Sequence, residues 1–337
     1  MKFGTKNKDN AMMWMAKGAE QMLQGKPEKA ISMWRKLVRQ LGNNKDPAIM
    51  KIVSLAIAST AMALGELGRI DDAVSVYDDL EARFGSVTLP VIREQRVRAL
   101  MSKASMLGRV GRIEEAGLAY DSVDRQFGND NAAIQKEVAQ ALMLRVATLG
   151  VMNRQEEILV VADAMLSRFG NTDDPEITKA VASVLGAKVG VLRMIGRHDE
   201  ATVVDTQLLE RCGTSDDPDL VYEMVHAAML KGTTLVNMDQ LRKGSVPVAA
   251  CEEAIQVYDT IEERFGGNRY PDIAGLVGNA MMNKSALLEW LGRHEEAMAV
   301  YDEVVTRFEG SHSPEMKQIV QAAVKRKAET MKKVSGK

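Results

Sequence analysis

Apolar residues recur along the chain at the spacing of one helical face, in units that repeat. In residues 70–84, for example, Ala73, Val76, Tyr77 and Leu80 follow the i, i+3, i+4, i+7 pattern of an amphipathic helix. Two short phrases bracket such segments: Gly-Arg-x-acid-acid-Ala opens them, and Arg-Phe-Gly or a relative ends them. The closing phrase ends at residues 42, 85, 128, 170, 213, 266 and 309, so most units are about 43 residues long.

Each unit predicts a pair of helices. A proline follows most closing phrases, and Pro47, Pro175 and Pro218 come directly after Asp, a typical N-cap before a proline at the first helical position. From there an apolar pattern runs about 20 residues to the next Gly-Arg. We call this the first helix of a hairpin, and the helix that starts at Gly-Arg the second. We expect each closing glycine to adopt the left-handed conformation that ends many helices.

Stacking of the hairpins is predicted because one hairpin cannot bury the apolar stripes of both its helices, whereas neighbouring hairpins can. The chain should therefore be all-α, an α-solenoid forming a single domain over residues 1–337. Residues 314–333, apolar on one side and basic elsewhere, predict a C-terminal capping helix. We expect about seven hairpins, near residues 10–42, 47–85, 90–128, 131–170, 175–213, 218–266 and 271–309.

One interval between closing phrases is 53 residues long. The extra residues place an insertion at about 239–248, within the sixth hairpin. Insertions in repeat proteins map to loops. The sequence is equally consistent with a loop that has a function and with a loop that has none.

The composition agrees with a helical protein that does not bind nucleic acid. Hydrophobic residues make up 46% of the chain but aromatic residues only 4%, and the apolar residues are chiefly Ala, Leu, Val and Met. The net charge is −2, so neither nucleic acid nor an anionic membrane is expected as the main partner. Residues 1–51 carry 11 basic against 4 acidic side chains and residues 317–337 carry 7 against 1, so the middle is acidic.

No constellation in the sequence predicts catalysis, a cofactor or a metal site. Cys212 and Cys251 have no short spacing, the four histidines are scattered, and metalloprotease, CxxC, GxSxG and phosphate-loop motifs do not occur. The acidic pairs after Gly-Arg fall in first helical turns, where the helix dipole favours them, so a structural role is expected. We therefore expect a non-enzyme.

The sequence also predicts a cytoplasmic protein without a membrane insertion. The N-terminus lacks the apolar segment of a secretory signal. The longest uncharged stretch, residues 52–65, has 14 residues and is too short to span a bilayer.

These residues resemble the tetratricopeptide repeat family over nearly the whole chain. The glycine, acidic pair and alanine at 68–73, 111–116 and 292–297 are similar to that family's hairpin turn, and Tyr77, Tyr120, Tyr258 and Tyr301 stand where the family carries an aromatic residue. The unit is longer than the family's 34 residues, and Leu or Met replaces its first-helix Trp, as in a long-unit bacterial variety. The resemblance implies a right-handed superhelix whose first helices line a concave groove for peptides or partner proteins.

Two charged columns emerge when the units are aligned. The cationic column, 13 residues after each first-helix start, is Thr60, Lys103, Arg145, Lys188, Lys231, Lys284 and Lys327. The anionic column on the second helices is Asp78, Asp121, Asp163, Asp259 and Asp302. The cations could form a ladder for an acidic ligand, but an internal ion-pair ladder is favoured, because stacking is what every unit needs.

Function is expected where the units differ. Two positions of the first helices should face the groove, and they hold the candidate partner-binding residues Arg98, Met101, Gln140, Met143, Ser183, His226, Met229, Asn279 and Met282. Small residues one turn further, such as Ser105 and Ala147, should leave the groove floor open. Methionine suits surfaces that accept irregular apolar ligands, although these methionines would equally serve as core between hairpins.

The leading functional hypothesis is a non-catalytic protein–protein interaction scaffold or adaptor that binds a partner peptide or helix on the concave face. The alternative is a ligand-responsive regulatory sensor that controls a partner enzyme or transcription factor. The charge layout, with basic ends and an acidic middle, supports a weaker third hypothesis, a self-assembling scaffold.

Overall fold

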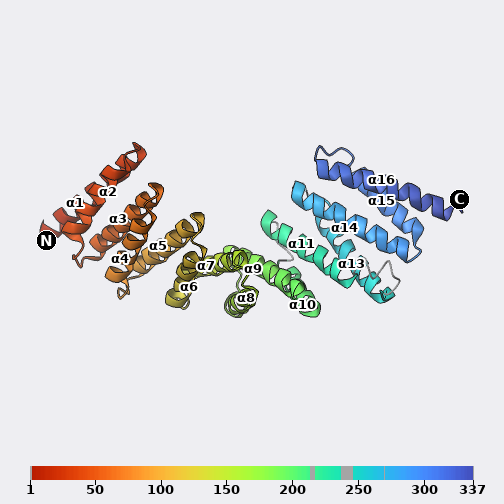
Figure 1. Ribbon diagram of the computed structural model, residues 1–337, viewed down its shortest axis with the longest axis horizontal. Helices are drawn as coiled ribbons and strands as arrows, with labels where there is room; N and C mark the ends of the chain where they lie inside the picture. The colour runs from red at the N-terminus through yellow and green to blue at the C-terminus, as the bar shows by residue number, and fades with distance from the viewer. Residues whose placement is uncertain (1, 213–216, 237–245, 269, 337) are drawn as a thin grey trace. The chain divides into compact units, whose positions relative to one another are not determined.

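The computed structural model describes residues 2–212, 217–236, 246–268 and 270–336. Over these ranges the chain forms fifteen α-helices and no β-strand (Figure 1). It divides into two compact units, Met1–Asn171 and Thr172–Lys337. In each unit antiparallel helical hairpins stack in chain order, which confirms the predicted all-α, solenoid-like repeat architecture.

The Met1–Asn171 unit contains four hairpins. Each helix packs against the next along the chain, and the first helices α1, α3, α5 and α7 also pack against one another in sequence. The first hairpin begins at Lys2, earlier than the expected start near residue 10. The helices are α1 (Lys2–Leu23), α2 (Pro27–Leu41), α3 (Pro47–Glu66), α4 (Ile70–Phe84), α5 (Pro90–Arg109), α6 (Ile113–Phe127), α7 (Ala132–Val151) and α8 (Gln155–Phe169).

The Thr172–Lys337 unit repeats this packing with three hairpins and a last helix that packs on both helices of the hairpin before it. Its helices are α9 (Pro175–Met194), α10 (His198–Cys212), α11 (Pro218–Leu235), α13 (Val248–Phe265), α14 (Pro271–Trp290), α15 (His294–Phe308) and α16 (Pro314–Val334). The expected insertion at 239–248 lies mostly outside the described residues, which resume at 246. A single right-handed superhelix over the whole chain stays a prediction.

The first helices begin where the Asp-Pro dipeptides predict. The carboxylates of Asp46, Asp174 and Asp217 accept hydrogen bonds from backbone N–H groups of the first turn. Asn131 caps α7, which has no proline, in the same way. Ser313 precedes Pro314 but makes no side-chain cap, so the serine variant of the signal is not used.

The expectation that closing glycines are left-handed is wrong. Gly85 and Gly266 have φ of −55° and −58°, whereas the hairpin-turn glycines are the left-handed ones, with Gly68 at φ 73°. The closing glycine is small for another reason. A Cβ on Gly266 or Gly128 would collide with the backbone carbonyl oxygen four residues earlier, at 2.4 and 2.6 Å. It would also meet a guanidinium of the next hairpin, that of Arg307 or Arg168. The closing phrase therefore provides an arginine and the space for its neighbour's arginine.

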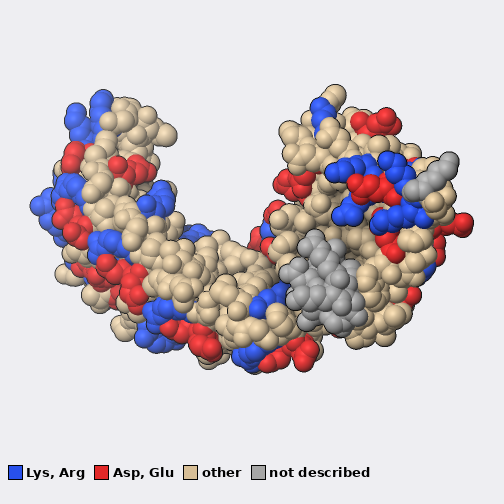
Figure 2. Space-filling model, turned by 45° about the vertical axis from the view of Figure 1, so that its right-hand side comes forward, with Lys and Arg blue, Asp and Glu red and all other residues tan. Residues whose placement is uncertain are grey.

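Ion pairs between successive hairpins explain the Gly-Arg phrase. Arg112 Nη1 lies 2.7 Å from Asp71 Oδ1 of the preceding hairpin, and its Nη2 lies 2.6 Å from Glu115 Oε2 of its own. The first acid thus pairs with the next hairpin's arginine and the second acid with its own. Basic and acidic side chains accordingly alternate along the lower edge of the Met1–Asn171 unit in Figure 2. The same inter-hairpin pair joins Arg69 to Glu28, Arg154 to Glu114 and Arg293 to Glu252.

Helix α3 is the one helix of the described part that is long and apolar enough to cross a membrane by length and composition. Its apolarity has a use inside the unit, because α1, α2, α4 and α5 all pack against it. Ile49, Val53, Ile57 and Leu64 are buried on one side of the helix, and the buried Ala56 and Ala61 widen that face. A helix that is apolar all round is expected at such a central position.

Candidate functional site

The first helices of the Met1–Asn171 unit border a cavity of about 450 Å³ between α3, α5 and α7. Met62, Met101 and Met106 supply much of its apolar lining, Tyr77 of α4 reaches it, and Gln140 of α7 stands on its far wall. Met62 is 52% exposed and Met106 only 4%, so the methionines extend from the surface to the core. The cavity therefore combines an adaptable apolar surface with polar groups from a neighbouring helix.

A second cavity of about 330 Å³ adjoins the first along α5 and α7. Ser105, Arg109 and Leu144 line both cavities, and Ala147 lines the second. The small side chains Ser105 and Ala147 stand where the sequence predicted an open floor. We call the two cavities together the Met101 groove, defined by Met62, Met101, Ser105, Arg109, Gln140 and Leu144.

Glycine at the ends of α3 and α5 keeps this groove open. Gly65 and Tyr77 line the first cavity, and Gly108 and Tyr120, at the same positions of the next hairpin, line the second. A Cβ on Gly108 would meet its nearest neighbour, the Ala116 Cβ, at 4.0 Å, so there is room for a side chain that the sequence does not supply.

The groove has a mixed-charge rim. Glu66, Arg109 and Glu137 join Gln140 in lining the first cavity. Burial raises the pKa of Tyr77 to about 12, an effect that a hydrogen bond with Ser102 and the charge of Arg109 partly offset. The Tyr77 hydroxyl is therefore neutral at physiological pH. Such a surface suits a peptide or helix with apolar side chains and a few polar groups.

The structure brings two of the nine predicted binding residues together in this groove, Met101 and Gln140. In the same unit Arg98 is exposed on α5, and Met143 is half-buried on α7. All four predicted methionines are half-buried: Met101, Met143, Met229 and Met282. Each of them therefore contributes both to the packing between hairpins and to the surface. Their burial is intermediate between the core role and the groove role that the sequence left open.

The remaining predicted residues lie on the first helices of the Thr172–Lys337 unit and are half-buried: Ser183, His226, Met229, Asn279 and Met282. The His226 ring stacks on Tyr222, with centroids 6.0 Å apart and planes 5° from parallel. Burial lowers the pKa of His226, and the charge of Arg193 lowers it further. This first-helix surface therefore adds an aromatic stack to its half-buried methionines, Met229 and Met282.

A buried ion pair lies beside His226. Arg193 of α9 pairs with Asp205 of α10, which is fully buried, and Arg193 Nε donates to Thr234 Oγ1 at 2.9 Å. Burial raises the pKa of Asp205 to about 6, although the charge of Arg193 opposes this shift. Within the part of the chain that the structure describes, Arg193 Nη1 and Asp205 Oδ1 are buried without a hydrogen-bond partner. The free-energy cost of desolvating the Asp205 carboxylate thus exceeds the stabilisation that it gains from pairing with Arg193.

The charged columns form the internal ladder that the sequence favoured. Each rung joins a cation of a first helix to the Asp of the preceding second helix. Four rungs are Lys103–Asp78 at 2.6 Å, Arg145–Asp121 at 2.8 Å, Lys284–Asp259 at 2.5 Å and Lys327–Asp302 at 2.5 Å. These cations are therefore engaged within the protein.

Sequence reasoning missed part of the groove. Met62 and Met106 lie near Met101 in space but stand at other positions of the repeat, so a search restricted to two aligned positions could not find them. Arg109 lies at the end of α5, next to the hairpin turn. The recurring glycine at 65 and 108 was the signal that would have pointed to an opening there.

Among the described residues, no three His, Cys, Asp or Glu side chains gather as a metal site would require. No family model and no curated protein matches the chain. Solved structures do. The crystal structure of the apo form of RapI has a TM-score of 0.50 at 12% identity, covering 95% of this chain and 86% of that one.

A tetratricopeptide repeat protein from Parabacteroides merdae ATCC 43184 has a TM-score of 0.40 at 12% identity, covering 94% of this chain and 99% of that one. BtubC from P. vanneervenii has a TM-score of 0.45 at 14% identity, covering 73% and 92%. At these identities the likeness is one of fold.

Proposed function

From its tetratricopeptide-like fold, we propose that this protein is a non-catalytic interaction scaffold or adaptor of the cytoplasm, which binds a peptide or helix of a partner protein. Stacked helical hairpins present extended surfaces that repeat proteins commonly use for binding. The observation that carries the proposal is the Met101 groove, two adjoining cavities of about 450 and 330 Å³ on the first helices of one unit.

The groove favours a polypeptide ligand with apolar anchors. Half-buried and exposed methionines adapt to different apolar side chains without a fixed shape. The rim offers a cation, carboxylates and an amide, which would orient a helix or an extended peptide by hydrogen bonds. The predicted binding residues Met101 and Gln140 both line this space, and Arg98 lies exposed one turn from Met101 on α5.

The test begins with a partner recovered from native lysate and reduced to its shortest binding segment. Calorimetry then compares the full chain with two variants. Met101→Glu places a charge in the apolar lining, and Gly108→Glu fills the second cavity. We expect each to weaken binding about tenfold or more, since a buried unpaired charge costs well over 1.4 kcal/mol.

Matched variants control for the substitutions themselves. Met331→Glu makes the same change at an exposed methionine of α16, and Gly310→Glu does so in an open turn. Both should bind as the unchanged protein does. Equal binding by all four variants would remove the groove from the proposal.

A second candidate function is a ligand-responsive sensor. The cavity volumes fall in the range that small molecules occupy in proteins. A sensor would show a rise in melting temperature with a metabolite-sized ligand, lost in Gly108→Glu, whereas an adaptor needs only the partner segment.

A further inference from the structure

The first rung of the charged ladder is inverted. In four other rungs a first helix supplies the cation and the preceding second helix supplies Asp, whereas Lys231 meets Thr206 instead. Between α2 and α3 the two positions hold Arg35 and Thr60 instead, 25 residues apart, as are Asp78 and Lys103. The cation is thus on the second helix, and no carboxylate stands at either rung position.

A cavity occupies the place of the missing rung. In the rung of Arg145 the cation fills the space between successive second helices: its side chain is only 7% exposed and reaches Asp121 of α6 and Glu157 of α8. Thr60 is too short to do so, and its hydroxyl donates to the Ala56 carbonyl of its own helix at 2.7 Å. The result is a cavity of about 490 Å³ between α2, α3 and α4.

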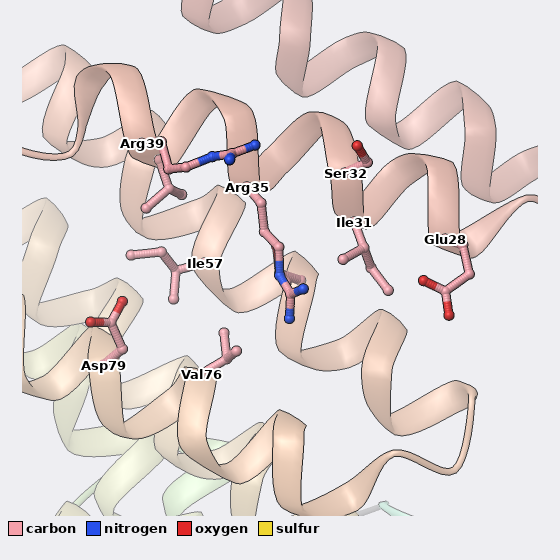
Figure 3. Close-up of a pocket in the computed structure, with 10 residues that line it drawn as sticks. Glu28, Ile31, Ser32, Arg35, Arg39, Ile57, Val76 and Asp79 are labelled. Atoms are coloured by element: carbon pink, nitrogen blue, oxygen red, sulfur yellow. The ribbon is translucent and has the colours of Figure 1, made fainter.

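Figure 3 shows this cavity, which we call the Arg35 socket. Its apolar side is formed by Ile31, Ile57 and Val76, and the Arg35 guanidinium projects into the space between them. Arg39, one turn further along α2, lies at its edge.

The charges in the Arg35 socket are not balanced. Two acidic side chains lie on its border, but each is already used: Glu28 pairs with Arg69 at 3.3 Å, and Asp79 pairs with Arg83 at 2.6 Å. Among the described residues, neither Arg35 nor Arg39 forms an ion pair or a side-chain hydrogen bond. Two free guanidinium groups therefore stand over an apolar surface.

We propose that the Arg35 socket binds an acidic segment of a partner polypeptide, in which an Asp or Glu lies next to an apolar side chain. The carboxylate would pair with Arg35 and Arg39 and so complete the rung, since arginine binds carboxylates through two parallel hydrogen bonds. The neighbouring apolar side chain would pack on the half-buried Val38 and Val76, which lie over the buried Ile31 and Ile57. This surface lies on the second helices, separate from the Met101 groove, and the inference does not depend on that groove.

A polypeptide is favoured over a small anion by the character of the site. Both arginines are exposed, so an inorganic anion would gain only a screened attraction. The apolar side contributes only when the ligand itself brings apolar surface to bury. An acidic peptide uses both halves of the socket.

The most specific variant copies a complete rung of the same chain into the Arg35 socket. Arg35→Asp together with Thr60→Lys rebuilds the rung found at Asp78 and Lys103, which should fill the socket while preserving the fold. Arg35→Gln removes the charge alone and keeps the test valid if the double variant melts early. Arg125→Gln, on the exposed surface of α6, changes the net charge by the same amount as the double variant and is the matched control.

Short random peptides displayed on phage are selected on the full chain and then measured by fluorescence polarisation. We expect enrichment of Asp or Glu beside Leu, Ile, Val or Phe. Binding should weaken about tenfold or more in the rebuilt-rung variant and in Arg35→Gln, and stay unchanged in Arg125→Gln and in Met101→Glu.

Four outcomes would overturn the proposal. The first two are selection of peptides without acidic residues and equal binding of the selected peptides by the rebuilt-rung variant and the unchanged chain. The third is binding of inorganic phosphate through Arg35 when no acidic peptide binds. The fourth is a dimer in light scattering that the rebuilt rung dissociates, in which case the occupant is a second copy of the chain.

Discussion

The two units build the same position of the repeat in opposite ways. At the ends of α3 and α5 a glycine lines the same cavity as the tyrosine of the following helix, Gly65 with Tyr77 and Gly108 with Tyr120. In the first hairpin of the Thr172–Lys337 unit the equivalent positions hold Arg193 and Asp205, which form a buried ion pair.

The last hairpin offers a third solution. Glu289 replaces the glycine and accepts a hydrogen bond of 2.7 Å from the Tyr301 hydroxyl. Comparison of the three shows that the hairpin backbone does not require a particular pair here. What changes is what occupies the first-helix position: a glycine beside a cavity, an arginine in a buried ion pair, or a carboxylate that is hydrogen-bonded to tyrosine.

The largest effect on stability should come from breaking the buried ion pair between Arg193 and Asp205. Asp205→Ala leaves the Arg193 guanidinium buried without its counter-charge, and we expect a loss of about 3 kcal/mol in unfolding free energy. Hydrogen exchange of α9, α10 and α11 in the full chain measures it. Asp78→Ala, at an exposed rung, should change protection of its own helices by less than about 1 kcal/mol. Equal losses in the two variants would show that Asp205 is not the buried partner described above.

The comparison becomes sharper when the Arg193–Asp205 pair is replaced by the glycine and tyrosine of the other unit. Arg193→Gly with Asp205→Tyr reproduces the Gly65 and Tyr77 pair, and we expect it to recover nearly all of the loss caused by Asp205→Ala, to within about 1 kcal/mol of the unchanged protein. A tyrosine restores buried apolar surface, while the added glycine costs about 1 kcal/mol in the helix.

The same hydrogen-exchange experiment measures the unfolding free energy of this double variant. A double variant that is no more stable than Asp205→Ala would mean that the two pairs are not interchangeable, and that surroundings specific to α9 and α10 require the charges.

Much of the fold was predictable from sequence because it depends on local, repeated signals. The apolar spacing and the Asp-Pro starts placed the hairpins, and the Gly-Arg turns are left-handed at Gly68 and Gly111. The closing glycines were misinterpreted because a position can require glycine for either of two reasons. One is a positive φ, and the other is a lack of space for a Cβ atom. Only contact with an arginine of the next hairpin, such as Arg307 over Gly266, separates the two.

The candidate site was less predictable, since it combines residues from three helices at different repeat positions. Met101 and Gln140 were found because they belong to aligned positions, whereas Met62 and Arg109 were not. The inverted rung was visible as Thr60 in a cationic column, but its consequence, a cavity with two free arginines, required the packing of α2 and α4.

The Arg193–Asp205 pair should also make stability depend on pH. Burial raises the pKa of Asp205 from its ordinary 3.8 to about 6, so the folded protein binds this proton more tightly than the unfolded chain does. The contribution of Asp205 to stability is therefore greatest below about pH 4 and is lost as the pH rises to about 6. We expect a decrease of about 1–3 kcal/mol over this range, measured as the difference from Asp205→Asn.

His226 contributes with the opposite sign, because its pKa is lowered and its protonation disfavours the folded state as the pH falls. It is present in both proteins, so the difference between them isolates Asp205. The Met1–Asn171 unit has Gly65 and Tyr77 at these positions and should show no corresponding dependence in its own helices between pH 4 and 6. A difference from Asp205→Asn that is flat over this range would refute the assignment.

The smallest effect concerns the rungs that both units share. Lys103 pairs with Asp78 at 2.6 Å, but the Asp78 side chain is 60% exposed, so solvent screens the attraction. A double-mutant cycle with Lys103→Ala and Asp78→Ala should give a coupling of about 0.2–1 kcal/mol. Arg145 is 7% exposed and bound to Asp121 at 2.8 Å, so the same cycle there should give a larger value. Equal couplings would mean that the ladder acts through the packing of its aliphatic stems rather than through charge, and the free Arg35 would then have no reason to seek a carboxylate.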